Sequence, residues 1–269
     1  MHTIPEFQEI CEEAVHAAGR VLLERQGRVE VREKGPADLV TEADFAAQET
    51  VRQIVLSAFP DHCLLGEEGP RGTDPRAEYR WIVDPLDGTT NYVHGLPFYS
   101  VSLALEHNGE LLVGAIYDPV SNECFTAAAG QGALLDGRPI HTSGITNLKG
   151  AVAAAGLPAM VQRDAPDLLV FLELLPECQA LRRLGSAALN MAYLAAGRMD
   201  LFWSFSTKIW DIAAGALILR EAGGVISSPD GGDFILEDAH FLSAANRALQ
   251  QQLLEVARRA LRTPSHGVK

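Results

Sequence analysis

Two aspartates three residues apart, followed by glycine and threonine, are the part of the chain best suited to chemistry. They stand in Asp84-Pro85-Leu86-Asp87-Gly88-Thr89-Thr90, directly after the apolar run 81–83, which is typical of a strand entering a core. A proline stops the strand ladder, so both carboxylates are expected where this strand ends. Hard cations such as Mg²⁺ prefer carboxylate oxygens, and the following N–H groups and hydroxyl suit a bound anion. The segment therefore predicts a metal and phosphate site, with an acidic turn as the alternative interpretation.

Three further acidic clusters fall where helices or strands are expected to begin or end. Each has a structural alternative: Thr41 with Asp44 fits a helix capping box, Glu67 and Glu68 between glycines fit an exposed turn, and Asp211 at a helix start would complement the helix dipole. The clusters are Asp38-Leu39-Val40-Thr41-Glu42-Ala43-Asp44, Gly66-Glu67-Glu68-Gly69 and Trp210-Asp211.

Taken together, the four clusters resemble the inositol monophosphatase family, the Mg²⁺-dependent, lithium-sensitive sugar and nucleotide phosphatases. The segment at 84–89 resembles the family's Asp-Pro-hydrophobic-Asp-Gly-Thr signature, and Trp210-Asp211-Ile212-Ala213-Ala214-Gly215 resembles its second signature. Further matches in order and spacing are Glu67-Glu68, Asp38-Leu39-Val40-Thr41 and Leu184-Gly185-Ser186-Ala187-Ala188. The likeness covers roughly residues 5 to 260.

The resemblance implies a set of metal ligands. Glu67, Asp84 and the backbone carbonyl of Leu86 would bind the first Mg²⁺ ion. Asp84, Asp87 and Asp211 would bind the second, with Asp84 bridging the two ions. Glu67 would also anchor a third, weaker ion through water, so two to three Mg²⁺ ions are expected, with Mn²⁺ as a substitute.

The resemblance also assigns catalytic and substrate-binding groups. Asp44 would bond to Thr89, and this pair would orient or deprotonate the attacking water, with Glu67 as the third catalytic residue. The N–H groups of Gly88 and Thr89 would hold phosphate oxygens. Two ions roughly 3.5–4 Å apart can neutralise the phosphoryl oxygens, align the water and stabilise the leaving alkoxide. The expected substrate contacts beyond the phosphate are Ser186, Ala187 and Ser204.

Position 204 departs from the inositol-specific pattern. Inositol-cleaving members carry a glutamate seven residues before the second-signature aspartate, whereas this chain has Ser204. A short neutral side chain there, with the cation of Lys208 four residues on, suggests a different or more anionic leaving group. The first expectation is a small sugar or polyol phosphate such as inositol monophosphate. Histidinol phosphate, fructose 1,6-bisphosphate and 3′-phosphoadenosine nucleotides are alternatives, as is a non-catalytic, metal-binding regulatory protein.

The amino-acid composition limits the classes of partner that the protein is expected to bind. The 269 residues are 47% hydrophobic and 21% charged, which is ordinary globular material. A net charge of −13 argues against nucleic acid as the main ligand. No apolar run approaches the roughly 18 residues that span a bilayer, and the acidic N-terminus does not resemble a secretion signal. We therefore expect a cytoplasmic protein without a membrane partner and, from the resemblance only, a homodimer.

Residue periodicity indicates an α+β first half (1–140) and an α/β second half (141–269) with a shared core and a cleft between them. The resemblance implies a layered αβαβα sandwich of the sugar-phosphatase type, with two intimately packed subdomains. Loop 35–37 is expected to be mobile without metal, and tail 263–269 frayed. Helices are expected at 4–22, 41–58, 164–175, 186–196, 211–222 and 247–261, and strands at 28–34, 81–83, 99–106, 111–117, 124–128, 133–135, 151–155, 200–205 and 225–227.

Overall fold

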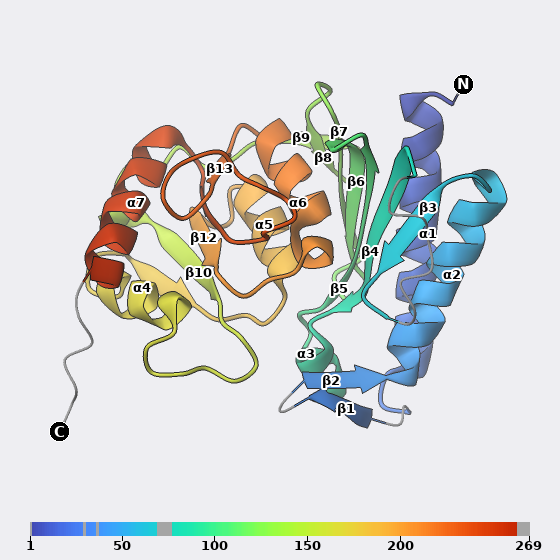
Figure 1. Ribbon diagram of the computed structural model, residues 1–269, viewed down its shortest axis with the longest axis horizontal. Helices are drawn as coiled ribbons and strands as arrows, with labels where there is room; N and C mark the ends of the chain where they lie inside the picture. Colours follow the sequence, from blue (N-terminus) through green and yellow to red (C-terminus); the bar gives the residue numbers. More distant parts are fainter. Residues whose placement is uncertain (1, 29–30, 36–37, 69–76, 263–269) are drawn as a thin grey trace.

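The computed structural model describes residues 2–28, 31–35, 38–68 and 77–262, which fold into five alternating layers of helix and sheet. Two helices cover the outer face of a seven-stranded sheet, two fill the space between that sheet and a five-stranded sheet, and two cover the far side (Figure 1). The predicted αβαβα sandwich is therefore confirmed. In layer order the helices are α1 (Ile4–Arg25) and α2 (Glu42–Ala58), α5 (Ala187–Ala195) and α6 (Ile209–Glu221), and α4 (Pro166–Leu174) and α7 (Arg247–Arg262).

The seven-stranded sheet is antiparallel except at its first pair, where β3 runs parallel to β4. Its β5–β6 hairpin turns at Asn108 and Gly109, which both have positive φ (53° and 87°), as the Asn-Gly pair predicted. In spatial order the strands are β3 (Cys63–Gly66), β4 (Tyr79–Asp87), β5 (Ser100–His107), β6 (Glu110–Asp118), β7 (Glu123–Ala128), β8 (Ala133–Leu135) and β9 (Arg138–Ile140).

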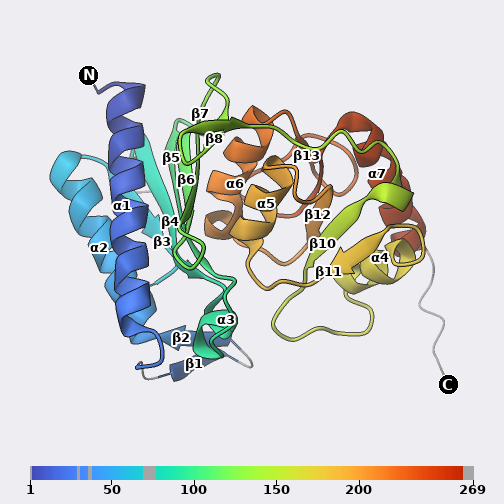
Figure 2. The same cartoon turned by 180° about the vertical axis from the view of Figure 1, so that it is seen from behind.

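Both faces of this sheet are buried, so its central strands are apolar on both sides. Trp81 and Val83 pack into the cluster that contains the first two helices, whereas Ile82 between them packs into the cluster on the α6 side. Small residues let α6 approach closely, because a Cβ added at Gly114 would lie 3.1 Å from the Cα of Ala214. Figure 2 shows α5 and α6 between the two sheets from behind.

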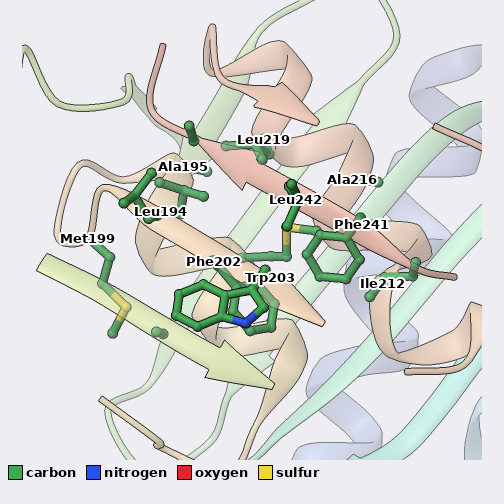
Figure 3. Packing of buried hydrophobic residues seen from close by; sticks show 14 of the residues in the cluster. Leu194, Ala195, Met199, Phe202, Trp203, Ile212, Ala216, Leu219, Phe241 and Leu242 are labelled. Carbon is green, nitrogen blue, oxygen red and sulfur yellow. The ribbon is translucent and has the colours of Figure 1, made fainter. Parts of the chain in front are cut away.

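The five-stranded sheet places two strand ends together. β10 runs parallel to β12, with Gly156 paired to Ser204 at their carboxyl ends. The rings of Phe202 and Phe241 meet edge-on with centroids 5.2 Å apart, in the buried cluster that Figure 3 shows. In spatial order the strands are β11 (Ala180–Arg182), β10 (Val152–Gly156), β12 (Leu201–Ser204), β14 (Phe241–Ala244) and β13 (Val225–Ser227), and one 3₁₀ turn, Leu148–Gly150, precedes β10.

All six expected helices form, and the elements that were not predicted are short. They have three to five residues each, too few for a periodic pattern to show. β14 nevertheless takes an interior place in its sheet, because pairing with β12 and β13 supplies the hydrogen bonds that its own sequence does not specify. The unpredicted elements are α3 (Thr89–Val93), β2 (Asp38–Thr41), β3, β9, β11, β14 and the 3₁₀ turn.

The segment before α2 forms a two-stranded antiparallel pair of β1 (Val31–Gly35) with β2 (Asp38–Thr41). Residues 36–37 of the loop expected to be mobile, and the tail 263–269, lie outside the described residues. The division at residue 140 stays a prediction. None of the helices in the described ranges combines the length and apolar character that crossing a membrane requires.

Close packing of α6 on α5 gives a test of the fold. A Cβ at Gly215 would lie 2.5 Å from the Cβ of Met191, so Gly215→Ala must displace one helix. We expect it to lower the free energy of unfolding by about 1–3 kcal/mol in urea titrations. Gly144→Ala is the matched control, because no atom lies within 4 Å of its added Cβ. Equal stability of the two variants would contradict this packing.

Candidate active site

The two aspartates of the first signature lie on one strand that continues through both of them. The expectation that the strand covers 81–83 and ends before the two carboxylates was therefore wrong: β4 extends to Asp87. Asp84 pairs with Ser102 and Asp87 with Ser100, so three steps along β4 match two along β5. Residues three apart on a regular strand point to opposite faces, and this extra residue, a β-bulge, returns both carboxylates to one side. The missing N–H of Pro85 costs little in a bulge.

Asp87 is bound by the start of α5. Its Oδ1 accepts the Ala187 N–H at 3.2 Å, and its Oδ2 accepts the Ala188 N–H at 2.7 Å and the Ser186 hydroxyl. Ser186 also caps this helix by accepting the Leu189 N–H at 3.1 Å. Ser186 and Ala187, predicted as substrate contacts, thus place their donors on a predicted metal ligand, and both line the adjoining cavity.

Thr89 lies between two acceptors. Its hydroxyl is 3.1 Å from the Leu86 carbonyl and 3.4 Å from Asp44 Oδ1, so a single hydroxyl proton can serve either one. The capping box at Thr41 is confirmed, because Asp44 Oδ2 accepts the Thr41 N–H at 2.8 Å and its hydroxyl at 2.6 Å. Asp44 therefore caps α2 with one oxygen and faces Thr89 with the other.

Gly88 joins the strand to α3 with a left-handed φ of 98°. An added Cβ would lie 3.0 Å from the Phe98 carbonyl oxygen and 3.3 Å from that of Gly185. Any other residue would therefore strain the backbone and crowd two neighbouring segments. This turn places the Gly88 and Thr89 backbone at the wall of the cavity.

The acidic pair after β3 is not the exposed turn that was one interpretation. The Glu68 side chain is 4% exposed and Glu67 is half-buried. Gln48 of α2 holds this segment, because its amide oxygen accepts the Glu68 N–H at 2.9 Å and its amide nitrogen donates to the Glu68 carbonyl. The Glu67 charge therefore acts on the signature carboxylates: after burial, it is the next cause that raises the pKa of Asp84.

Asp211 lies in the first turn of α6, two residues later in the helix than predicted. Its Oδ2 accepts the Lys208 N–H at 2.7 Å, which caps the helix. Burial, followed by the charges of Glu67, Asp87 and Asp211, raises the pKa of Asp84, so these carboxyls lie close enough to interact. The structure therefore brings residues from three separate segments, Glu67, Asp84 with Asp87, and Asp211, into one interacting cluster.

Burial and mutual repulsion make these carboxyls weak acids. Burial, followed by the charges of Glu67, Asp87 and Asp211, raises the pKa of Asp84 well above its usual range. Burial raises the pKa of Asp87 to about 6, although the hydrogen bonds donated by the start of α5 act to lower it. Burial, followed by the Asp87 charge, raises the pKa of Asp211 to about 8. Burial likewise raises the pKa of Asp44. A cation in the cluster would remove this penalty.

The donor set suits a hard divalent cation, because carboxylates supply the oxygen ligands. Within the described residues, no group of three or more His, Cys, Asp or Glu side chains is arranged as a ready-made metal cage. The carboxylates of Asp84, Asp87 and Asp211 accept protein N–H groups instead. Mg²⁺ takes few protein ligands and keeps several waters, so a closed cage is not required for it. The residues present fit Mg²⁺.

A cavity of about 490 Å³ adjoins the cluster. Its walls include Asp87 and Asp211 together with the paired strand ends at Gly156 and Ser204. Ser204 is fully buried and donates its hydroxyl to the Gly156 carbonyl at 3.1 Å. The volume is within the range of small-molecule sites. The predicted substrate residues Gly88, Thr89, Ser186, Ala187 and Ser204 all line this cavity.

Sequence reasoning missed several cavity residues, among them Asn91, Asn190 and Arg183, and it misplaced Lys208. Asn91 donates to the carbonyls of Phe98 and Leu184 at 2.7 Å each and so ties two cavity loops together. Asn190 and Arg183 also line the cavity. Lys208 does not: it lines a separate hollow of about 510 Å³. The sequence signal available for Asn91 and Asn190 was only that polar residues interrupt apolar segments.

Fold and site together define a layered α/β protein with a carboxylate cluster beside a small-molecule cavity. A model of the inositol monophosphatase family matches residues 5–262. The chain belongs to the inositol monophosphatase family, as its two signatures implied.

Known relatives match nearly the whole chain. The inositol-1-monophosphatase of Mesorhizobium japonicum is 40% identical over 253 residues, which are 93% of this chain and 95% of that protein. The Nus factor SuhB of Pseudomonas aeruginosa is 40% identical over 251 residues, 90% and 93% of the two chains. The crystal structure of extragenic suppressor protein suhB from Bartonella henselae superposes with a TM-score of 0.90 at 36% identity, covering 94% of this chain and 99% of that one.

The raised pKa values predict how pH and Mg²⁺ act together on stability. A carboxyl whose pKa is higher in the folded protein than its ordinary 3.8 favours folding while protonated. This contribution is complete below pH 3.8 and is lost as the pH rises through about 6 for Asp87 and about 8 for Asp211. We therefore expect the melting temperature of the metal-free protein to lose this contribution between about pH 4 and about pH 8.

Mg²⁺ favours the charged form of the cluster, so the rise in melting temperature on adding Mg²⁺ should grow over the same pH interval. Thermal unfolding in EDTA and in Mg²⁺ at each pH measures both trends. Asp87→Asn is the comparison variant, in which the Mg²⁺-induced rise in melting temperature should increase less with pH. A Mg²⁺ effect that stays constant across this interval would be inconsistent with the assigned electrostatics.

Proposed function

We propose that this chain is a Mg²⁺-dependent phosphomonoesterase that hydrolyses a small sugar or polyol phosphate. The observation that carries the proposal is the cluster of Glu67, Asp84, Asp87 and Asp211, whose buried charges repel one another beside a cavity. A cation bound among these carboxylates would offset their repulsion at neutral pH. Family membership and the name of the Mesorhizobium relative support a phosphatase.

The ions would be held as the family pattern implies. Glu67, Asp84 and the Leu86 carbonyl form one ligand set, and Asp84, Asp87 and Asp211 form the other, for two to three Mg²⁺ ions or Mn²⁺ in their place. When bound, they would neutralise the phosphoryl oxygens and lower the pKa of the attacking water. Hydrogen bonds orient two of these carboxylates: the start of α5 donates to Asp87, and the Lys208 N–H donates to Asp211.

The chain's own groups handle the proton and the phosphate. Thr89 Oγ1 would accept the proton of the attacking water while its own proton passes to Asp44 Oδ1, 3.4 Å away. The water oxygen bonds to phosphorus as the ester P–O bond breaks, and the leaving alkoxide takes up a proton to become an alcohol beside inorganic phosphate. The N–H groups of Gly88 and Thr89 would bind phosphoryl oxygens.

A second candidate is a non-catalytic, metal-binding regulatory protein, because the Pseudomonas relative is named a Nus factor. The enzyme is favoured because Asp44 and Thr89 are placed for proton transfer, which metal binding alone does not need. A homodimer, a cytoplasmic location and the absence of nucleic-acid binding remain proposals here.

Phosphate release in the presence of Mg²⁺ tests the function. We expect release from at least one of inositol 1-phosphate, glycerol 2-phosphate, histidinol phosphate, fructose 1,6-bisphosphate and 3′-phosphoadenosine 5′-phosphate, and loss of release in EDTA because no cation then offsets the charge. Asp87→Asn should abolish it. If Mg²⁺ raises the melting temperature but phosphate is released from none of these compounds, the result would contradict the phosphatase and favour the regulatory protein.

Substitution at Thr89 tests the proton relay. Thr89→Ala removes the hydroxyl and should lower kcat roughly 10²- to 10⁴-fold while changing KM little, since the backbone N–H remains. Thr89→Ser keeps the hydroxyl and is the matched control, expected to retain most of the activity. If both variants lose activity equally, the hydroxyl is not the group that matters.

A further inference from the structure

We propose that Arg183 forms an anion-binding subsite in the cavity, so that the natural substrate is a phosphomonoester whose leaving group carries a second anionic group, a carboxylate or another phosphate. This inference rests on the proposed function and specifies its substrate class. It assigns specificity to a residue outside both signatures and outside the predicted substrate contacts.

Arg183 has donors to spare at the cavity. It lies in the loop between β11 and α5, is exposed, and lines the cavity. Among the residues that the structure describes, its side chain forms one hydrogen bond, from Nη2 to the Pro158 carbonyl at 3.3 Å, in the loop that follows β10. A guanidinium offers five N–H donors in a fork that matches a carboxylate or phosphate. No carboxylate in the described ranges forms an ion pair with it.

The charge around the cavity favours a polyanion. Arg183 is the only lysine or arginine among the described residues that line it, since Lys208 lines the separate hollow. The lining carboxylates are Asp87 and Asp211, which bound Mg²⁺ would neutralise. With ions in place, the Arg183 charge stays uncompensated. The phosphoryl group would bind the Mg²⁺ ions, so the Arg183 guanidinium is left to bind a second anionic group on the leaving group.

The cavity interior also suits such a leaving group. The side chain of Ser204 is neutral, so this position adds no negative charge that would repel an anion. Asn190 of α5 is 1% exposed, and its Oδ1 has no hydrogen-bond partner, although the residue lines the cavity. A buried amide without a partner is costly unless a water or ligand group occupies it. The wall of the cavity at α5 therefore contains an unsatisfied hydrogen-bond acceptor.

The neighbouring Arg182 provides a matched control. It is also exposed, it donates to the Leu181 carbonyl at 2.9 Å, and it does not line the cavity. The experiment compares Arg183→Ala, Arg183→Lys and Arg182→Ala with the unchanged protein. The substrates are glycerol 2-phosphate, with a neutral leaving group, 3-phosphoglycerate, with a carboxylate, and fructose 1,6-bisphosphate, with a second phosphate.

We expect Arg183→Ala to lower kcat/KM roughly 10- to 100-fold for at least one anionic leaving group and less than about threefold for glycerol 2-phosphate. Arg182→Ala should behave like the unchanged protein, and Arg183→Lys should fall between. A loss confined to 3-phosphoglycerate would identify a carboxylate subsite, and one confined to fructose 1,6-bisphosphate a phosphate subsite. An equal loss on all three substrates, or none, would overturn the subsite.

A binding measurement separates this inference from the proposed function. If the unchanged protein hydrolyses nothing, the phosphatase proposal fails. Calorimetric binding of 3-phosphoglycerate and fructose 1,6-bisphosphate in Mg²⁺ still reports on the subsite. Affinity for one of them should then weaken roughly tenfold or more in Arg183→Ala but not in Arg182→Ala. Binding that is undetectable, or equal in both variants, would also overturn the subsite.

Discussion

Repulsion among the buried carboxyls of Asp84, Asp87 and Asp211 is the constraint on which the rest of the structure depends. Each is held against this repulsion by N–H groups from a different element: the β4 bulge, the start of α5 and the residue before α6. These elements belong to two adjoining layers, the seven-stranded sheet and the α5–α6 layer beside it, so the packing of helix layer on sheet brings the charges together. A single-layer arrangement would not gather side chains so far apart in the sequence.

Local patterns predicted most of the fold because their causes are local. The Asn108-Gly109 turn and the capping box of Asp44 depend on residues next to them, and both form as expected. The course of β4 depends on its partner. Pro85 suggested an end, but pairing of Asp87 with Ser100 continues the strand beyond it. The sequence of this segment alone does not predict its pairing with β5.

The sequence motifs predicted the site residues that lie within them. Residues that belong to the site only through their position in the fold were missed. Sequence distance placed Lys208 near the leaving group, yet it lines the other hollow, because the chain turns there into α6. Arg183 reaches the cavity through a loop whose sequence shows no motif for it. Side-chain direction at loop ends follows from backbone course, which the spacing of charged residues does not reveal.

The bonds between Asp87 and α5 have a thermodynamic consequence. Asp87 belongs to the seven-stranded sheet, whereas Ser186, three residues after Arg183, begins the helix that faces it. An ion that draws charge from this carboxylate weakens its hold on the helix start, and with it on the loop that carries Arg183. Ion and leaving group would then be linked ligands, each altering the affinity of the other by the same factor. Selectivity for the organic part of the substrate would then depend on which cation the cell supplies.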